Sequence, residues 1–206
     1  MKKKRRNFSS FNLAEAYKEL GLTKLIEWKL DASPVAPSAF YHQRLQRLHA
    51  RFNLTTSERA KELLIDAICE EALEVSPNLK IWKAAAIQSD DLIGLADYVA
   101  APDRDYLDTP LLCIVEAKKD DFEQGLAQCL VEMKACQWNN AQSGSAIDVY
   151  GVVTNGESWK FYQLTTEGQV FESALFALRD IAEILGCLRL IFKKCEENIA
   201  VFAQAA

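Results

Sequence analysis

The sequence predicts an α/β protein built around one mixed sheet. Hydrophobic residues make up 50% of its 206 residues and charged residues 26%, which is the balance of an ordinary globular protein. Strand-like runs come in groups between amphipathic segments instead of alternating with them one by one. Such grouping favours a sheet with both parallel and antiparallel pairs. The expected order is α-β-β-β-α-β-β-α, preceded by a helical N-terminal extension.

Residues 1–55 are expected to form a basic tail and this helical extension. The opening MKKKRRNFSS is basic and lacks the apolar run of a secretory signal. Helices are predicted over 12–30 and 40–52, and the two prolines of DASPVAPSAF separate them.

Residues 56–206 are expected to form the main domain. Its first helix begins at Thr56 or Ser57, both good N-cap residues, and runs to about Val75, shortly before Pro77. The Asn-Gly pair in TNGE is a strong signal for a tight hairpin. Apolar runs and their periods predict the other elements: strands over 79–87, 93–101, 111–118, 147–154 and 158–164, and helices over 121–137 and 174–200.

The charge balance argues against a protein that wraps nucleic acid over its whole surface. The net charge is −5, and the basic residues at positions 2–6 supply +5, which leaves −10 for the rest of the chain. Contacts with phosphates must therefore come from local patches. The candidates are the basic N-terminus and the helix face that carries Arg44, Arg47 and Arg51, although such a face is often merely solvated.

Cysteine spacing and hydropathy indicate the compartment. The six cysteines show no metal-binding spacing, so they are expected to be small core residues in a reducing environment. No apolar run approaches the roughly 20 residues that span a bilayer, and the expected location is the cytoplasm, with no membrane partner.

Charged residues stand at core-like positions in two neighbouring strands. In CIVEAKKDD, residues 113–121, Glu116 and Lys118 share one face at the end of an apolar run. In LIGLADYVAA, Asp97 stands alone among apolar residues. A buried carboxylate costs several kcal/mol unless it is paired or bound to a metal, so these positions are candidate site residues.

A third carboxylate is predicted on the first helix of the main domain. Glu71 falls near the middle of that helix's apolar stripe, which points it toward the sheet unless the helix is slightly rotated. Carboxylates of this kind bind Mg²⁺, and Mn²⁺ is the expected substitute. A lysine beside them would handle the proton of an attacking water, because its pKa falls readily when it is desolvated.

At these residues the sequence resembles the PD-(D/E)XK nuclease superfamily, which has the restriction-endonuclease-like fold. The phrases GLADYV, LCIVEAKKD, EQGLAQCLVEMKA and VYGVVTNGESWKFYQL are most similar to the N-terminal nuclease domains of type I restriction motor subunits. The resemblance covers about residues 57–165. One departure is that Ala96, and not proline, precedes Asp97.

The resemblance implies a role for each matching residue. Asp97 and Glu116 would bind Mg²⁺ with the backbone carbonyl of Ala117. Lys118 would be the catalytic lysine and Glu71 an accessory carboxylate. Gln128 would match the glutamine that follows the strand in several of these families, and Gln124 is a weaker match: both lie off the core stripe expected for their helix.

The implied activity is Mg²⁺-dependent hydrolysis of phosphodiester bonds, by an endonuclease of DNA restriction, defence or processing. The alternative is a catalytically silent member of the fold that acts as a binding or regulatory module. The apolar C-terminal helix leaves a further choice between core packing and a homodimer or larger assembly.

Overall fold

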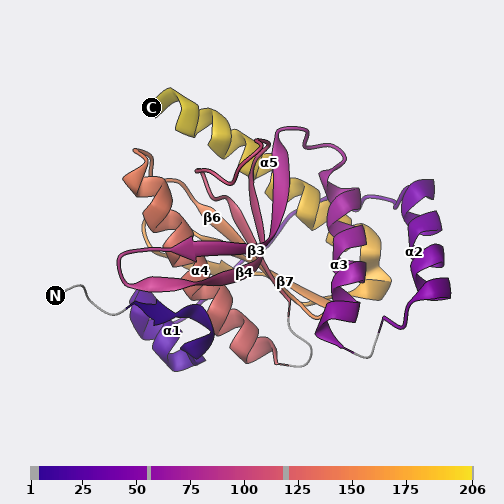
Figure 1. The fold of residues 1–206 in the computed structure, drawn as a ribbon, viewed down its shortest axis with the longest axis horizontal. Helices are drawn as coiled ribbons and strands as arrows, with labels where there is room; N and C mark the ends of the chain where they lie inside the picture. The colour runs from indigo at the N-terminus through magenta and orange to yellow at the C-terminus, as the bar shows by residue number, and fades with distance from the viewer. Residues whose placement is uncertain (1–4, 55–56, 118–120, 206) are drawn as a thin grey trace.

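The computed structural model describes residues 5–54, 57–117 and 121–205. They form a mixed α/β fold in which helices cover both faces of a sheet (Figure 1). The helices are α1 (Leu13–Leu20), α2 (Ala39–Arg51), α3 (Glu58–Leu73), α4 (Phe122–Gln142) and α5 (Ile181–Ala205). The strands are β1 (Arg6–Asn7), β2 (Ile26–Glu27), β3 (Leu79–Gln88), β4 (Leu92–Pro102), β5 (Cys113–Ala117), β6 (Val149–Thr154), β7 (Ser158–Leu164), β8 (Val170–Glu172) and β9 (Phe176–Ala177).

The sheet confirms the mixed pairing expected from the sequence. Strands β3, β4 and β5 pair antiparallel, β5 and β6 pair parallel, and β6 and β7 form the antiparallel hairpin around TNGE. From α3 onward the elements run α3, β3, β4, β5, α4, β6, β7, β8, β9 and α5, so two short strands that the sequence did not predict precede the last helix. Those two strands arise because residues after β7 fold back and pair with it.

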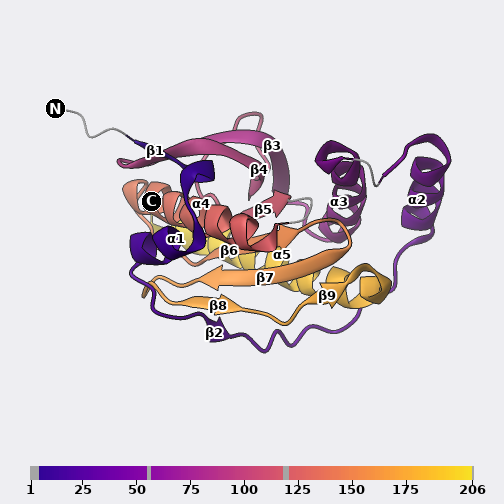
Figure 2. The same ribbon diagram turned by 90° about the horizontal axis from the view of Figure 1, so that it is seen from below.

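Two hydrophobic cores lie on opposite faces of the sheet. Val99, Ile114 and Val153 belong to the core beneath α4, together with residues of α1. Their neighbours Tyr98, Val115 and Val152 belong to the core beneath α3 and α5. This alternation is the two-residue period of a strand. Figure 2 shows α4 and α5 on the two sides of the strands.

Several helix boundaries differ from the predicted ones: α4 and α5 run on to Gln142 and Ala205, beyond the predicted ends at 137 and 200, and two helices are shorter at one end. The helix expected over 12–30 ends at Leu20, because Gly21 adopts a left-handed conformation with φ of 70° and caps it. The helix expected over 174–200 begins only at Ile181, because β9 and a 3-10 turn occupy the preceding residues. Most of its apolar residues lie in the core, which confirms the core-packing interpretation of this helix.

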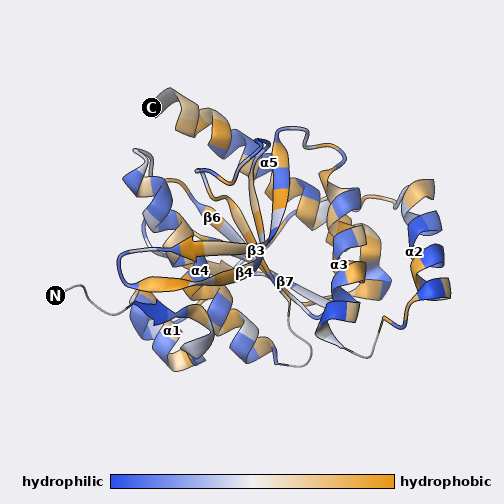
Figure 3. Ribbon diagram, in the orientation of Figure 1, coloured by the Kyte–Doolittle hydropathy of each residue, from blue (hydrophilic) through white to orange (hydrophobic). Residues whose placement is uncertain are grey.

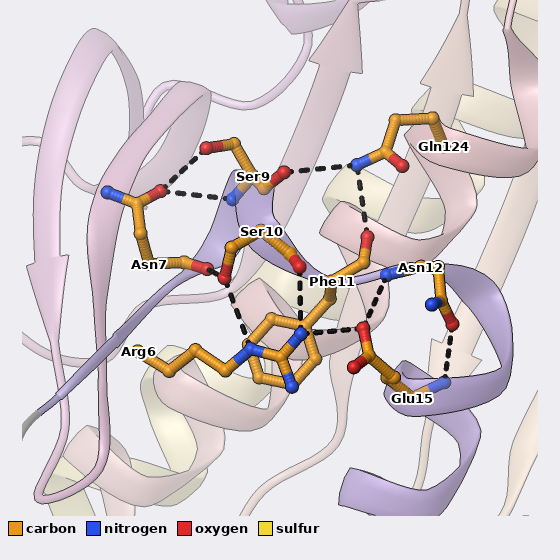
Figure 4. Close-up of polar contacts among 8 residues, drawn as sticks. All are labelled: Arg6, Asn7, Ser9, Ser10, Phe11, Asn12, Glu15 and Gln124. Carbon is orange, nitrogen blue, oxygen red and sulfur yellow. Dashed lines mark hydrogen bonds and ion pairs between the residues drawn. The ribbon is translucent and has the colours of Figure 1, made fainter.

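The N-terminal segment is joined to the same sheet. Strand β1 pairs with β4, and β2 pairs with β8. Phe8 and Phe11 are buried in the core beneath α4, and the Arg6 guanidinium lies 3.7 Å from the centre of the Phe11 ring. Figure 4 shows Arg6, Glu15 and Gln124 in the polar network that holds this segment. Residues 5–54 therefore complete the fold that supports the site.

All six cysteines are buried and free of disulfide bonds, as expected for small core residues. Within the described ranges, no helix is long and apolar enough to cross a membrane.

Candidate active site

Asp97 lies at the point where β4 and β5 separate. Regular pairing between these strands ends at Tyr98 and Val115. One residue further along β4, Oδ2 of Asp97 accepts a hydrogen bond of 2.9 Å from the backbone N–H of Ala117. The structure therefore brings Asp97 to the residue next to Glu116, as the strand positions predict.

Glu116 lies on the face of β5 that packs against α4, and its exposed fraction is 0%. Opposite it on α4 lie Gln128, 6% exposed, and Glu132, 0% exposed. Nε2 of Gln128 donates a hydrogen bond of 3.0 Å to Oε1 of Glu132. Burial raises the pKa of the nearby Cys129 thiol well above its usual value, and the carboxylates of Glu132 and Glu116 raise it further. The carboxylates of Glu116 and Glu132 thus both lie close enough to Cys129 to act on its thiol, in an otherwise apolar layer.

Sequence reasoning missed Glu132. It follows Gln128 by four residues, so the two lie on the same helix face, and it interrupts the apolar run CLVEM. That spacing was the signal that could have found it. The structure also places Gln128 inside, whereas the predicted core stripe left it outside, because α4 is buried over a wider part of its surface than one stripe.

The backbone beside Asp97 is irregular. Pairing between β3 and β4 runs from Leu79–Pro102 to Gln88–Ile93 and skips the pair formed by Ala84 and Asp97. Ala84 has a φ of 49°, in the left-handed region that disfavours residues with a side chain. Local strain of this kind is common where a strand must aim a functional side chain.

Glu71 is buried, as its position on the apolar stripe predicts, but its carboxylate serves another element. Oε1 accepts a hydrogen bond of 2.7 Å from the backbone N–H of Ser38, and Oε2 accepts one of 2.8 Å from the Ser38 hydroxyl. Ser38 is the N-cap of α2. The structure therefore places Glu71 at the junction of α2 and α3, and not with Asp97 and Glu116.

Gln124, the weaker match, bonds to the N-terminal segment. Its Nε2 donates hydrogen bonds to the backbone carbonyls of Phe11, at 3.1 Å, and Ser9, at 3.4 Å (Figure 4). It ties the N-terminal segment to the first turn of α4. Lys118, the expected catalytic lysine, lies outside the described residues.

The arginine face predicted for the second helix is present on α2, at the outer side of α3 (Figure 1). Arg44 pairs with Glu70 at 2.6 Å, whereas Arg47 and Arg51 are exposed. Two exposed aromatic residues, Phe40 and Phe52, line a groove on α2 together with these three arginines. Figure 3 shows hydrophilic residues along most of this helix.

The basic N-terminus is described only from Arg5 onward. Arg5 donates a hydrogen bond to Gln88, and Arg6 pairs with Glu15 at 2.6 Å. Residues 2–4, which carry the rest of the basic tail, lie outside the described residues.

The donor chemistry at Asp97 and Glu116 fits a hard divalent cation. Two carboxylates and a carbonyl oxygen are the ligand types that Mg²⁺ takes, usually with water completing its shell. In the part of the chain that the structure describes, no group of three or more His, Cys, Asp or Glu side chains is placed to hold a metal. The ligand set expected for Mg²⁺ contains only two carboxylate side chains, those of Asp97 and Glu116, and its third donor is the backbone carbonyl of Ala117.

Comparisons with known proteins give one short match. No family model matches the sequence. A stretch of 50 residues is 42% identical to Crinkler effector protein 5 of Phytophthora infestans, covering 24% of this chain and 13% of that protein. The chain thus matches only a small part of that relative.

Proposed function

We propose that this protein is a Mg²⁺-dependent nuclease of the PD-(D/E)XK type, with a restriction-endonuclease-like core, that cuts DNA in restriction, defence or DNA processing. One observation carries the proposal: the Asp97 carboxylate is bonded to the backbone beside Glu116, a carboxylate buried inside the sheet–helix layer. Such an arrangement is costly to build and suits a cation-dependent site.

Each residue has a role in this proposal. Asp97 and Glu116 hold the cation together with the Ala117 carbonyl oxygen. When bound, Mg²⁺ would offset the negative charge of the phosphate under attack. Lys118 takes the proton of the attacking water. Gln128 assists from α4, and its hydrogen bond to Glu132 fixes the orientation of its amide.

Contacts with the DNA backbone come from α2 in this proposal. Arg47 and Arg51 are exposed there, whereas Arg44 is already paired with Glu70. Since the chain as a whole is acidic, these two residues and the basic tail supply the local positive charge that phosphates require.

Cleavage of plasmid and single-stranded DNA with Mg²⁺ or Mn²⁺ tests the proposal. Asp97→Asn and Glu116→Gln keep the shape of each side chain and remove its charge. Each is expected to lower the cleavage rate by roughly a hundredfold or more, because an interaction worth several kcal/mol with the cation is lost. Asp103→Asn is the matched control, since Asp103 pairs with Lys80 at the far end of β3 and β4.

Equal cutting by the wild type and both variants would indicate a contaminating nuclease and would overturn the proposal. Folded wild-type protein that binds DNA without cutting it would instead favour a silent binding module with the same fold. Circular dichroism of each variant separates loss of activity from loss of folding.

A further inference from the structure

A groove of about 530 Å³ lies beside the candidate active site. Residues of α4 form one wall, and residues of β7 and the turn before it form the other. Its lining is Leu13, Phe122, Glu123, Leu126, Asn155, Ser158, Lys160, Tyr162, Glu172 and Leu175. This size falls in the range of small-molecule and nucleotide sites.

Strand register places the groove next to Glu116. Glu116 pairs with Val153 on β6, and Val153 pairs with Lys160 on β7. These three residues form one row across adjacent strands, so two strand spacings, about 10 Å, separate the backbone at Lys160 from that at Glu116. The groove therefore begins about two strand spacings from the backbone of Glu116, a distance that about one to two nucleotides of an extended strand can span.

Asn155 supplies an oriented hydrogen-bond donor at the groove. Its side-chain oxygen accepts hydrogen bonds from the backbone N–H groups of Glu157, at 3.0 Å, and Ser158, at 2.8 Å. These two bonds fix the amide plane. Among the described residues, its amide nitrogen donates to no partner, and the Ser158 hydroxyl also makes no side-chain bond. This wall thus presents one oriented amide donor and one rotatable hydroxyl that make no internal hydrogen bond to the residues that the structure describes.

The opposite wall is mostly apolar and carries one carboxylate, that of Glu123. Phe122 is partly buried against the core, Leu126 lies below it, and Leu175 is 57% exposed at the rim. An aromatic ring and aliphatic side chains, together with an oriented amide donor and a rotatable hydroxyl, suit a flat ring with polar atoms on its edge. On the groove floor, Lys160 pairs with Glu172 at 2.8 Å and keeps two further N–H donors for a phosphate oxygen.

We infer that this groove binds one unpaired base of a DNA strand, next to the bond that is cut. The base lies against Phe122 and Leu126, and the Asn155 amide donates a hydrogen bond to an acceptor on its edge. The inference rests on the proposed nuclease function for the identity of the ligand. It specifies the substrate as single-stranded DNA or DNA with an unpaired segment, because a base inside a duplex is not free to enter.

Binding measured without metal separates base recognition from backbone attraction. The probes are a labelled oligothymidylate and an abasic strand with the same number of phosphates, followed by fluorescence anisotropy in EDTA. The wild type is expected to bind the oligothymidylate roughly tenfold more tightly, which is the contribution of one stacked base. Because both probes carry the same number of phosphates, attraction between the protein and the DNA backbone contributes equally to both dissociation constants and drops out of their ratio.

Two variants test the two walls, and each removes the contact that one wall is proposed to make with the base. Phe122→Leu keeps an apolar side chain without the ring. Asn155→Asp keeps the acceptor for the turn and loses the donor. Each is expected to bring the ratio close to one. Gln169→Glu makes the same amide-to-carboxylate change at an exposed position outside the groove and is expected to leave the ratio unchanged.

The outcomes distinguish the groove from the nuclease. A wild type that cuts DNA but binds both probes equally, or a ratio that survives both variants, would overturn the groove assignment while the nuclease proposal stands. A wild type that never cuts DNA but prefers the oligothymidylate, with the preference lost in both variants, would support the groove and overturn the nuclease.

Discussion

A strained backbone residue lies across from a candidate catalytic side chain. Ala84 has a left-handed φ, and its place in the strand pairing is opposite Asp97. Regular pairing of β3 and β4 is interrupted only at this pair among their described partners from Leu79 to Pro102. The Asp97 carboxylate then takes the place of a backbone acceptor for the N–H of Ala117. Asp97 thus links β4 to β5 where the two strands separate, at the residue next to Glu116.

Replacing Ala84 by glycine is expected to stabilise the fold. Ala84 is exposed, so the change removes little packing, and glycine adopts a φ of 49° without the steric cost that alanine bears. The free energy of unfolding in urea is expected to rise by about 0.5 kcal/mol, because the relief of strain exceeds the extra entropy that glycine loses on folding. Ala86→Gly, at an exposed and regularly paired position of the same strand, is the control and is expected to destabilise. Loss of stability in Ala84→Gly would contradict the assignment of strain.

At the scale of elements, the close approach of α4 to β6 positions the site. A side chain at Gly151 would place its Cβ 2.7 Å from both the Cys129 and Met133 sulfur atoms. Gly151 pairs with Ile114, two residues before Glu116 on the same face of β5. The absence of a side chain therefore lets α4 carry Gln128 and Glu132 close to Glu116.

Gly151→Ala is expected to lower the free energy of unfolding by about 1–3 kcal/mol, because the added methyl group forces the helix or Met133 to move. Thermal and urea unfolding measure the loss. Combining it with Met133→Ala tests the cause: truncating Met133 should cost less in the Gly151→Ala background than in the wild type. Additive losses would show that the contact with Met133 is not the source.

At the scale of the whole molecule, the buried cysteines report on the integrity of both cores. Burial raises the pKa of Cys69 and of Cys187 to about 12, from an ordinary value of 9.0. Folded protein at pH 8 is therefore expected to leave its six thiols unreactive toward a disulfide reagent until it unfolds.

The same pKa shifts set the pH dependence of stability. Above pH 9.0 the thiols ionise in the unfolded chain and stay neutral in the folded one, so the unfolded state binds fewer protons and the free energy of unfolding falls as the pH rises. Urea midpoints at pH 8 and pH 10 measure this fall. Rapid thiol labelling of the native protein, or constant stability across this range, would contradict the account.

The sequence predicted the parts of the molecule that depend on local pattern. The strands around Asp97 and Glu116, the TNGE hairpin and the helices α2 to α4 are periodic and well capped, so their positions were predictable. Contacts between segments that are far apart in the sequence could not be predicted in this way. Glu71 lies on an apolar stripe, but only the fold reveals that Ser38 bonds to its carboxylate. Gln128 was expected outside because the sequence of one helix does not show how much of its surface the rest of the fold covers.

Calorimetric titration with Mn²⁺ is the most direct test that Asp97 and Glu116 form one cation site. The wild-type protein is expected to bind one ion, and Asp97→Asn and Glu116→Gln are each expected to weaken binding by roughly tenfold or more, because each removes one charged ligand. Asp103→Asn should bind as the wild type does. Folded wild-type protein that takes up no Mn²⁺, or binding that both variants leave intact, would contradict the shared site.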